Sequence, residues 1–132
     1  MIIDASVAFK WIFVEDGSEA ASALLGRDDL LAPNLLLAEI GNALWKKGMR
    51  GELGDADAYA VQLAITRSLV TIADEGEVMP RALEMALDLE HPIYDCVYLA
   101  LAESLDDVLI TADTRFGRKV ASSRFSDRLK LL

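Results

Sequence analysis

Short apolar runs alternate with longer stretches of helical periodicity along most of this chain. The runs typical of strands cover 2–3, 30–32, 69–72 and 108–111. Strands that alternate with helices are joined by right-handed crossovers, which set the strands parallel in one sheet and the helices on both of its faces. The order therefore predicts an α/β fold with three layers, α/β/α, around a mainly parallel sheet.

Capping and turn residues place the helices between these runs. Ser6 can cap a helix over 7–12, and Pro33 suits the first turn of a helix that runs to about Met49. The turn 112–115 follows the last strand, and the tail beyond it carries no assigned element. The remaining predicted helices cover 18–25, 55–64, 78–89, which the His91–Pro92 turn ends, and a stretch that begins near Asp95.

Length and composition indicate one folded domain over residues 1–132. The chain is 53% hydrophobic, enough for one well-filled core. Its apolar stretches fall well short of the roughly 20 residues that a bilayer span needs, and the segment 1–4 lacks the features of a secretory signal. We therefore expect no membrane association and a cytoplasmic protein. The single cysteine, Cys96, forms no intrachain disulfide and is expected to be a small buried apolar residue.

The net charge of −9, from 13 basic and 22 acidic residues, argues against a protein that grips nucleic acid by bulk charge. Any contact with nucleic acid must then be local. Two basic segments near candidate catalytic acids offer such a surface: Lys46, Lys47 and Arg50 in one, and Arg115, Arg118, Lys119 and Arg124 in the other. The alternative interpretation of these residues is ordinary solvated charge.

Four acids stand where an acid is locally unexpected. Asp4 and Asp113 each follow a strand, so both should face the same edge of the sheet, where sites of such folds form. Glu39 interrupts an apolar helix, and Asp95 stands at a helix start. Each also has a structural interpretation: Asp4 as a strand-end cap, Asp113 as a turn residue, Glu39 as an ion-pair partner and Asp95 as an N-cap.

A metal ion would let such acids persist together. Isolated buried carboxylates are costly, so a group of them needs cations. Oxygen-only ligands suit Mg²⁺ or Mn²⁺, which can activate water toward a phosphodiester. His91 is the only histidine, which excludes a multi-histidine zinc site within one chain, and its place beside Pro92 favours a structural role in the turn.

Four sequence blocks occur in an order that resembles a known family. They are MIIDAS at 1–6, PNLLLAEIGNAL at 33–44, YDCVYLALAE at 94–103 and TADTRF at 111–116. Together they resemble a PIN-domain ribonuclease, the VapC-type toxin of a type II toxin–antitoxin system. The resemblance spans nearly the whole chain, although 51–78 carries no family block.

This resemblance implies a metal-dependent endoribonuclease that hydrolyses RNA phosphodiester bonds with Mg²⁺ or Mn²⁺. It implies a cognate antitoxin that covers the active site, and commonly a homodimer, for which Trp11, Ile12, Phe13 and Trp45 are candidate interface anchors. The residues that would bind metal and catalyse are Asp4, Glu39, Asp95 and Asp113. Those that would support the carboxylates or metal-bound waters are Ser6, Asn42 and Thr111.

Three other readings start from the same acids. A receiver-like phosphoacceptor domain shares the acid after the first strand, but this chain lacks the second acid beside it and an aspartate ending the central strand. A phosphatase with an aspartyl nucleophile would need an aspartate where Ser6 stands. A non-catalytic module whose acids attract a basic partner is physically reasonable, given the net charge. Acids on four separate segments favour the metal site.

Overall fold

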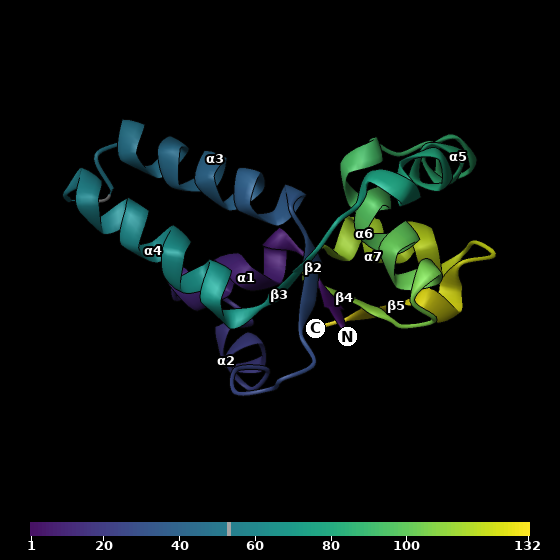
Figure 1. Ribbon diagram of the computed structural model, residues 1–132, viewed down its shortest axis with the longest axis horizontal. Helices are drawn as coiled ribbons and strands as arrows, with labels where there is room; N and C mark the ends of the chain where they lie inside the picture. The colour runs from purple at the N-terminus through teal and green to yellow at the C-terminus, as the bar shows by residue number, and fades with distance from the viewer. Residues whose placement is uncertain (53) are drawn as a thin grey trace.

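The computed structural model of the protein describes residues 1–52 and 54–132, which form helices around one parallel sheet (Figure 1). The strand order is β3-β2-β1-β4-β5, and every pairing is parallel. The strands are β1 (Ile2–Ile3), β2 (Leu31–Pro33), β3 (Thr71–Ala73), β4 (Leu109–Thr111) and β5 (Leu129–Leu131). The predicted α/β class and parallel sheet are confirmed.

Helices cover both faces of this sheet. In Figure 1, α1 to α4 lie on one side of the strands and α5 to α7 on the other. The helices are α1 (Ala5–Ile12), α2 (Ser18–Ser22), α3 (Leu35–Met49), α4 (Ala56–Leu69), α5 (Met79–Leu89), α6 (Ile93–Ser104) and α7 (Thr114–Ala121), with 3-10 turns η1 (Gly76–Val78) and η2 (Ser126–Arg128). Helices on both faces of the sheet make the three layers, α/β/α, that the sequence predicted (Figure 1).

The core lies where the central strands meet α6. Ile2 and Ile3 of β1 are fully buried, and Ile3 stands level with Ile110 of β4. On α6 the segment 96–102 is buried throughout, Cys96 included, because this helix packs on β1, β2 and β4. The register of β1 and β4 brings the residues after these strands, Asp4 and those from Thr111 onward, to one sheet edge.

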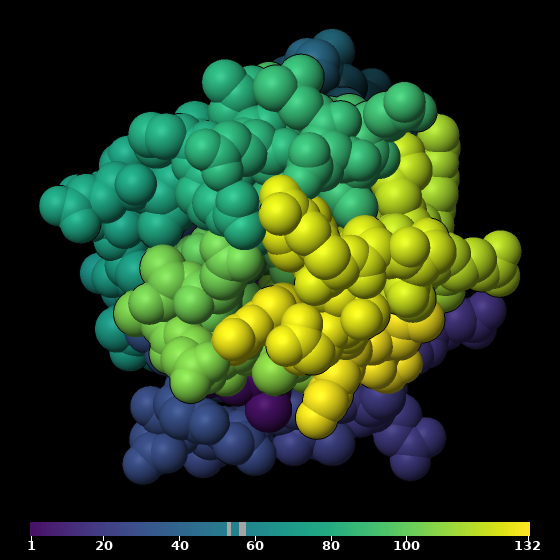
Figure 2. All heavy atoms as spheres, turned by 90° about the vertical axis from the view of Figure 1, so that its right-hand side faces the viewer, coloured from purple at the N-terminus to yellow at the C-terminus, as the bar shows by residue number. Residues whose placement is uncertain are grey.

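The C-terminal segment packs against α5 and α6. Figure 2 shows these residues, in yellow, against the teal-green surface of α5. Arg124 pairs with Asp88 of α5 and stacks on Phe125, while Arg128 pairs with Asp106 at 2.7 Å. These contacts hold β5 at the sheet edge beside β4.

Several element boundaries differ from the sequence prediction. The cap of α1 is Asp4, which accepts from the Val7 amide, and Ser6 lies inside the first turn. Pro33 ends β2 instead of opening a helix, because it continues the pairing with β3 opposite Ala73. The last strand, β5, lies in the tail for which no element was predicted.

Two further observations concern the predicted lack of a membrane span and the predicted start of the helix near Asp95. Among the described residues, no helix is long and apolar enough to cross a membrane. The α6 helix starts at Ile93, so Asp95 is in the first turn and is not the cap, which is Pro92.

Candidate active site

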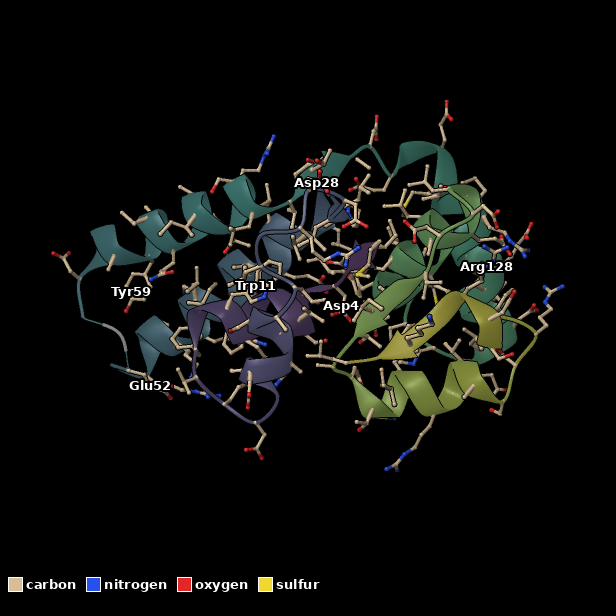
Figure 3. All side chains as sticks on the ribbon, turned by 90° about the horizontal axis from the view of Figure 1, so that it is seen from below. Asp4, Trp11, Asp28, Glu52, Tyr59 and Arg128 are labelled. Carbon is tan, nitrogen blue, oxygen red and sulfur yellow. The ribbon has the colours of Figure 1, made fainter. Side chains whose placement is uncertain are left out.

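Asp4 is a buried carboxylate at the end of β1, at the centre of the molecule between the two helical layers (Figure 3). Its Oδ1 accepts hydrogen bonds from the Ser6 hydroxyl at 2.6 Å and the Val7 amide at 3.1 Å. Its Oδ2 accepts from the Thr111 hydroxyl at 2.5 Å. Burial raises the pKa of Asp4 to about 6 against the opposing effect of these donors, and the charge of Asp95 raises it further.

The two hydroxyls that hold Asp4 also hold the loop after β4. Ser6 Oγ accepts from the Ala112 amide at 2.8 Å, and Thr111 Oγ1 accepts from the Asp113 amide at 3.0 Å. Each hydroxyl thus donates to Asp4 and accepts from a backbone N–H. The pair fixes the position of Asp4 relative to Asp113 across the parallel strands β1 and β4.

Asp113 caps α7 with one of its two carboxylate oxygens. Its Oδ1 accepts from the amides of Arg115 at 2.8 Å and Phe116 at 3.0 Å. Within the described ranges, no hydrogen bond is made to its Oδ2. The turn role proposed from the sequence and a ligand role are therefore compatible, because one oxygen serves each.

Glu39 of α3 meets Tyr98 of α6 across the sheet edge. The buried Tyr98 hydroxyl donates to Glu39 Oε2. Burial raises the pKa of Glu39, the hydrogen bond from Tyr98 opposes this, and the charges of Asp95 and Asp4 raise it again. The same burial and the charge of Glu39 raise the pKa of Tyr98. Asp4, Glu39 and Asp95 therefore lie close enough to repel one another.

Asp95 lies one turn before Tyr98 on α6. Its Oδ2 is 2.6 Å from His91 Nε2. In the residues that the structure describes, this is the only side-chain contact with a basic residue made by any of Asp4, Glu39, Asp95 and Asp113. The sequence analysis gave no role to Tyr98, although its position three residues after Asp95 puts both on one helical face.

An open pocket of about 470 Å³ joins two of the four acids. Glu39 and Asp113 line it together with Ser6, and Asp4 lies behind Ser6. Lys10 also lines the pocket, where its ammonium donates to Glu15 Oε1 and to the Asp16 carbonyl, both at 2.7 Å. The charged side chains that line the pocket are therefore acids and one lysine whose charge is already paired, and the rest of the lining is mostly apolar.

The donor set fits a hard divalent cation that keeps some of its water. The carboxylates supply oxygen ligands, and the mutual repulsion of Asp4, Glu39 and Asp95 favours a cation among them. Over residues 1–52 and 54–132, no three acidic, histidine or cysteine side chains converge closely enough to enclose an ion by themselves. Mg²⁺ commonly binds through one or two carboxylates with waters completing its shell.

Asn42 is the predicted site residue that stands apart. It is exposed on α3, and no hydrogen bond links it to the four acids in the described part of the chain. Ser6 and Thr111, by contrast, contact Asp4 directly. The structure thus brings the four acids, Ser6 and Thr111 to one sheet edge and leaves Asn42 outside their hydrogen-bond network.

The two basic segments differ in how their charges are used. Lys47 pairs with Glu52 at 3.0 Å and lies over the Phe13 ring, and Arg50 is also near Glu52. Lys119 donates to the Glu90 carbonyl, and Arg124 pairs with an aspartate of α5. Within these two segments, the exposed cations that make no ion pair with any described residue are Lys46 on α3 and, on α7 just after Asp113, Arg115 and Arg118.

The chain matches a known protein family and individual proteins along most of its length. The family model described as PIN domain matches residues 1–121. Ribonuclease VapC3 of Pyrobaculum aerophilum is 29% identical over 122 residues, which are 90% of this chain and 93% of that protein. Ribonuclease VapC9 of Mycobacterium tuberculosis H37Rv is 33% identical over 117 residues, 89% of this chain and 88% of that protein.

Solved structures share the fold. The crystal structure of PAE2754 from Pyrobaculum aerophilum superposes with a TM-score of 0.72 at 26% identity, over 89% of this chain and 77% of that one. The crystal structure of VapBC2 from Rickettsia felis, bound to a DNA fragment from their promoter, gives a TM-score of 0.70 at 16% identity, over 98% and 96%. At that identity the second match indicates the fold alone.

Proposed function

This chain belongs to the PIN domain family, and from that membership we propose that it is a metal-dependent endoribonuclease acting as the toxin of a toxin–antitoxin pair. The observation that carries the proposal is Asp4, a buried carboxylate held by hydroxyls, whose pKa is raised in part by the charge of Asp95. Glu39 lies beside them, and the charges of Asp95 and Asp4 raise its pKa. The relatives named as VapC ribonucleases support RNA as the substrate.

Asp4, Asp95 and Asp113 would hold Mg²⁺ or Mn²⁺, and Glu39 would bind the ion or steer the attacking water. The bound ion would lower the pKa of that water and neutralise charge on the reacting phosphate. Ser6 and Thr111 hold the Asp4 carboxylate in one orientation, and Tyr98 does the same for Glu39. Attack by water would leave a 5′-phosphate and a 3′-hydroxyl, with no covalent enzyme intermediate.

RNA would reach the pocket along α7. Arg115 and Arg118 follow Asp113 directly, and their charges are available because no described acid pairs with them. Phosphate contacts from arginine supply most of the sequence-independent affinity for nucleic acid. In a chain with a net charge of −9, such contacts would be confined to this stretch of surface.

Protein partners would use the acidic pocket and the exposed apolar side chains. An arginine of a cognate antitoxin would pair well with the carboxylates of the pocket. Among the predicted interface anchors, Trp45 is 61% exposed on α3, whereas Trp11 donates to the Ala21 carbonyl within the chain. We propose Trp45 as part of a contact with the antitoxin or with a second copy of the chain.

The test is cleavage of end-labelled total RNA by partner-free protein with Mg²⁺ or Mn²⁺, beside a chelator control. Asp4→Asn and Asp95→Asn should abolish the cuts, while Asp28→Asn, which removes an exposed charge in a loop, should retain them. No cutting by folded wild-type protein with either ion would reject the nuclease and favour a non-catalytic acidic binding module. Full cutting by Asp4→Asn would reject the assigned site.

A further inference from the structure

We propose that His91 is a positioning residue that fixes Asp95 relative to Asp113 by bridging α6 and α7. The inference rests on the proposed function, in which both aspartates hold the metal ion. The His91 side chain contacts Asp95 directly. It also contacts Phe116, whose backbone N–H donates to Asp113. His91 itself touches neither metal nor substrate in this scheme, so it is not a catalytic residue.

The contact with Asp95 is a directed hydrogen bond. His91 Nε2 lies 2.6 Å from Asp95 Oδ2, and an ionised carboxylate only accepts, so Nε2 carries the proton and donates. The His91 side chain is 9% exposed, which leaves water little access to compete for this bond. Oδ2 is thereby oriented from one side, and no described residue hydrogen-bonds to Oδ1.

The contact with α7 passes through a single residue, Phe116. The His91 ring stacks on the Phe116 ring, with centroids 4.6 Å apart and planes at 29°. The Phe116 backbone N–H donates to Asp113 Oδ1 at 3.0 Å. The ring of Phe116 therefore supports His91, while its backbone supports Asp113, and Phe116 is itself 1% exposed.

The backbone of His91 is held independently of both aspartates. Glu90 adopts a left-handed conformation with φ of 48° at the end of α5, and the His91 N–H then donates to the Ala86 carbonyl at 3.0 Å. Lys119 of α7 donates to the Glu90 carbonyl at 2.7 Å. Because its own backbone is fixed at the end of α5 by the bond to Ala86, His91 can impose a position on Asp95 instead of following it.

Such a bond should matter for metal binding more than for folding. Groups that hydrogen-bond a metal-ligating side chain typically change metal affinity or activity by about 10–100-fold when they are removed. The chain offers variants that separate the two contacts of His91. His91→Phe keeps a ring to stack on Phe116 and loses the donor, while His91→Gln keeps an N–H donor and loses the stack. Lys119→Met removes the neighbouring contact between α7 and the turn without touching a carboxylate.

The experiment measures Mn²⁺ affinity of RNA-free protein by calorimetry, with thermal unfolding of each metal-free variant. We expect His91→Phe to bind Mn²⁺ about tenfold or more weakly, His91→Gln to recover most of that loss, and Lys119→Met to bind as wild type does. Wild-type affinity in His91→Phe would overturn the inference, as would equal losses in His91→Phe and Lys119→Met. Failure of wild-type protein to bind Mn²⁺ would overturn the metal site of the proposed function as well.

A second readout does not depend on the metal or on activity. Because the chain has one histidine, ¹⁵N labelling gives one set of imidazole signals to assign. We expect a proton on Nε2 in the metal-free protein. A ring protonated on Nδ1 alone would contradict the hydrogen bond to Asp95 and reject the inference.

Discussion

Asp4 Oδ2 accepts a hydrogen bond of 2.5 Å from the hydroxyl of Thr111, a residue 107 positions later in the chain. With Ser6 on Oδ1, the carboxylate is held by neutral donors, which satisfy its geometry without cancelling its charge. A neutral cradle of this kind keeps a buried carboxylate available for a cation that arrives later.

The first prediction concerns stability against pH in the metal-free protein. The pKa of Asp4 is raised from 3.8 to about 6, so folding favours its protonated form. That contribution is fully present below pH 3.8 and is lost as the pH rises through about 6, a change on the order of 3 kcal/mol. Urea unfolding with chelator, from pH 4.5 to 7.5, should show Asp4→Asn gaining stability relative to wild type as the pH rises. If the stabilities of wild type and Asp4→Asn changed with pH in parallel, the burial assigned to Asp4 would be contradicted.

The second prediction separates the two roles of Asp113. Asparagine caps a helix about as well as aspartate, whereas alanine costs about 1 kcal/mol at this position. Asp113→Asn should therefore have a free energy of unfolding close to that of wild type, yet lose RNA cleavage. Asp113→Ala should lose RNA cleavage and also about 1 kcal/mol of stability. Cleavage at the wild-type rate by Asp113→Asn would leave Asp113 with its capping role alone.

The third prediction concerns Tyr98. Its hydrogen bond opposes the raised pKa of Glu39, so Tyr98→Phe should raise that pKa further. The acidic limb of the pH profile of kcat/KM should then move to higher pH, if Glu39 acts as its carboxylate. Tyr94→Phe, at a 59% exposed position beside Asp95, is the matched control and should leave the profile in place. Equal profiles for both variants would exclude a role for the Tyr98 hydroxyl.

The fourth prediction concerns the surface of α7. In an Asp4→Asn background, which prevents cleavage, Arg115→Gln with Arg118→Gln should weaken RNA binding across sequences. The slope of log affinity against log salt should fall by about 0.7 for each lost phosphate contact. Arg27→Gln removes an arginine that pairs with Asp29 at 2.7 Å and should leave the slope unchanged. Similar slopes in all three proteins would place RNA elsewhere.

Some of this site could be predicted from the sequence because it depends on strand order alone. Apolar runs that end at Asp4 and shortly before Asp113 indicated two parallel strands, and their pairing in register puts both acids at one edge. Cys96 was expected to be buried, and it is. Such features follow from patterns within a few residues, which the sequence displays directly.

Other features depend on contacts between distant segments. Nothing local to Tyr98 shows that its hydroxyl reaches Glu39, 59 residues earlier. Ser6 was assigned as a cap because it suits that role, but the helix begins earlier, with Asp4 accepting from the Val7 amide and held there by Thr111. The strand β5 was missed because its residues, Leu129–Leu131, are mostly exposed and gain their pairing only from β4.

The long separation between Asp4 and Thr111 also has a consequence during synthesis. The hydroxyl on Asp4 Oδ2 and the neighbouring Asp113 are made more than a hundred residues after Asp4. A chain still emerging from the ribosome cannot assemble the carboxylate cluster until β4 has paired with β1. Any hydrolytic activity that depends on this cluster is therefore withheld from the ribosome-bound chain until the segment with Thr111 and Asp113 has been made.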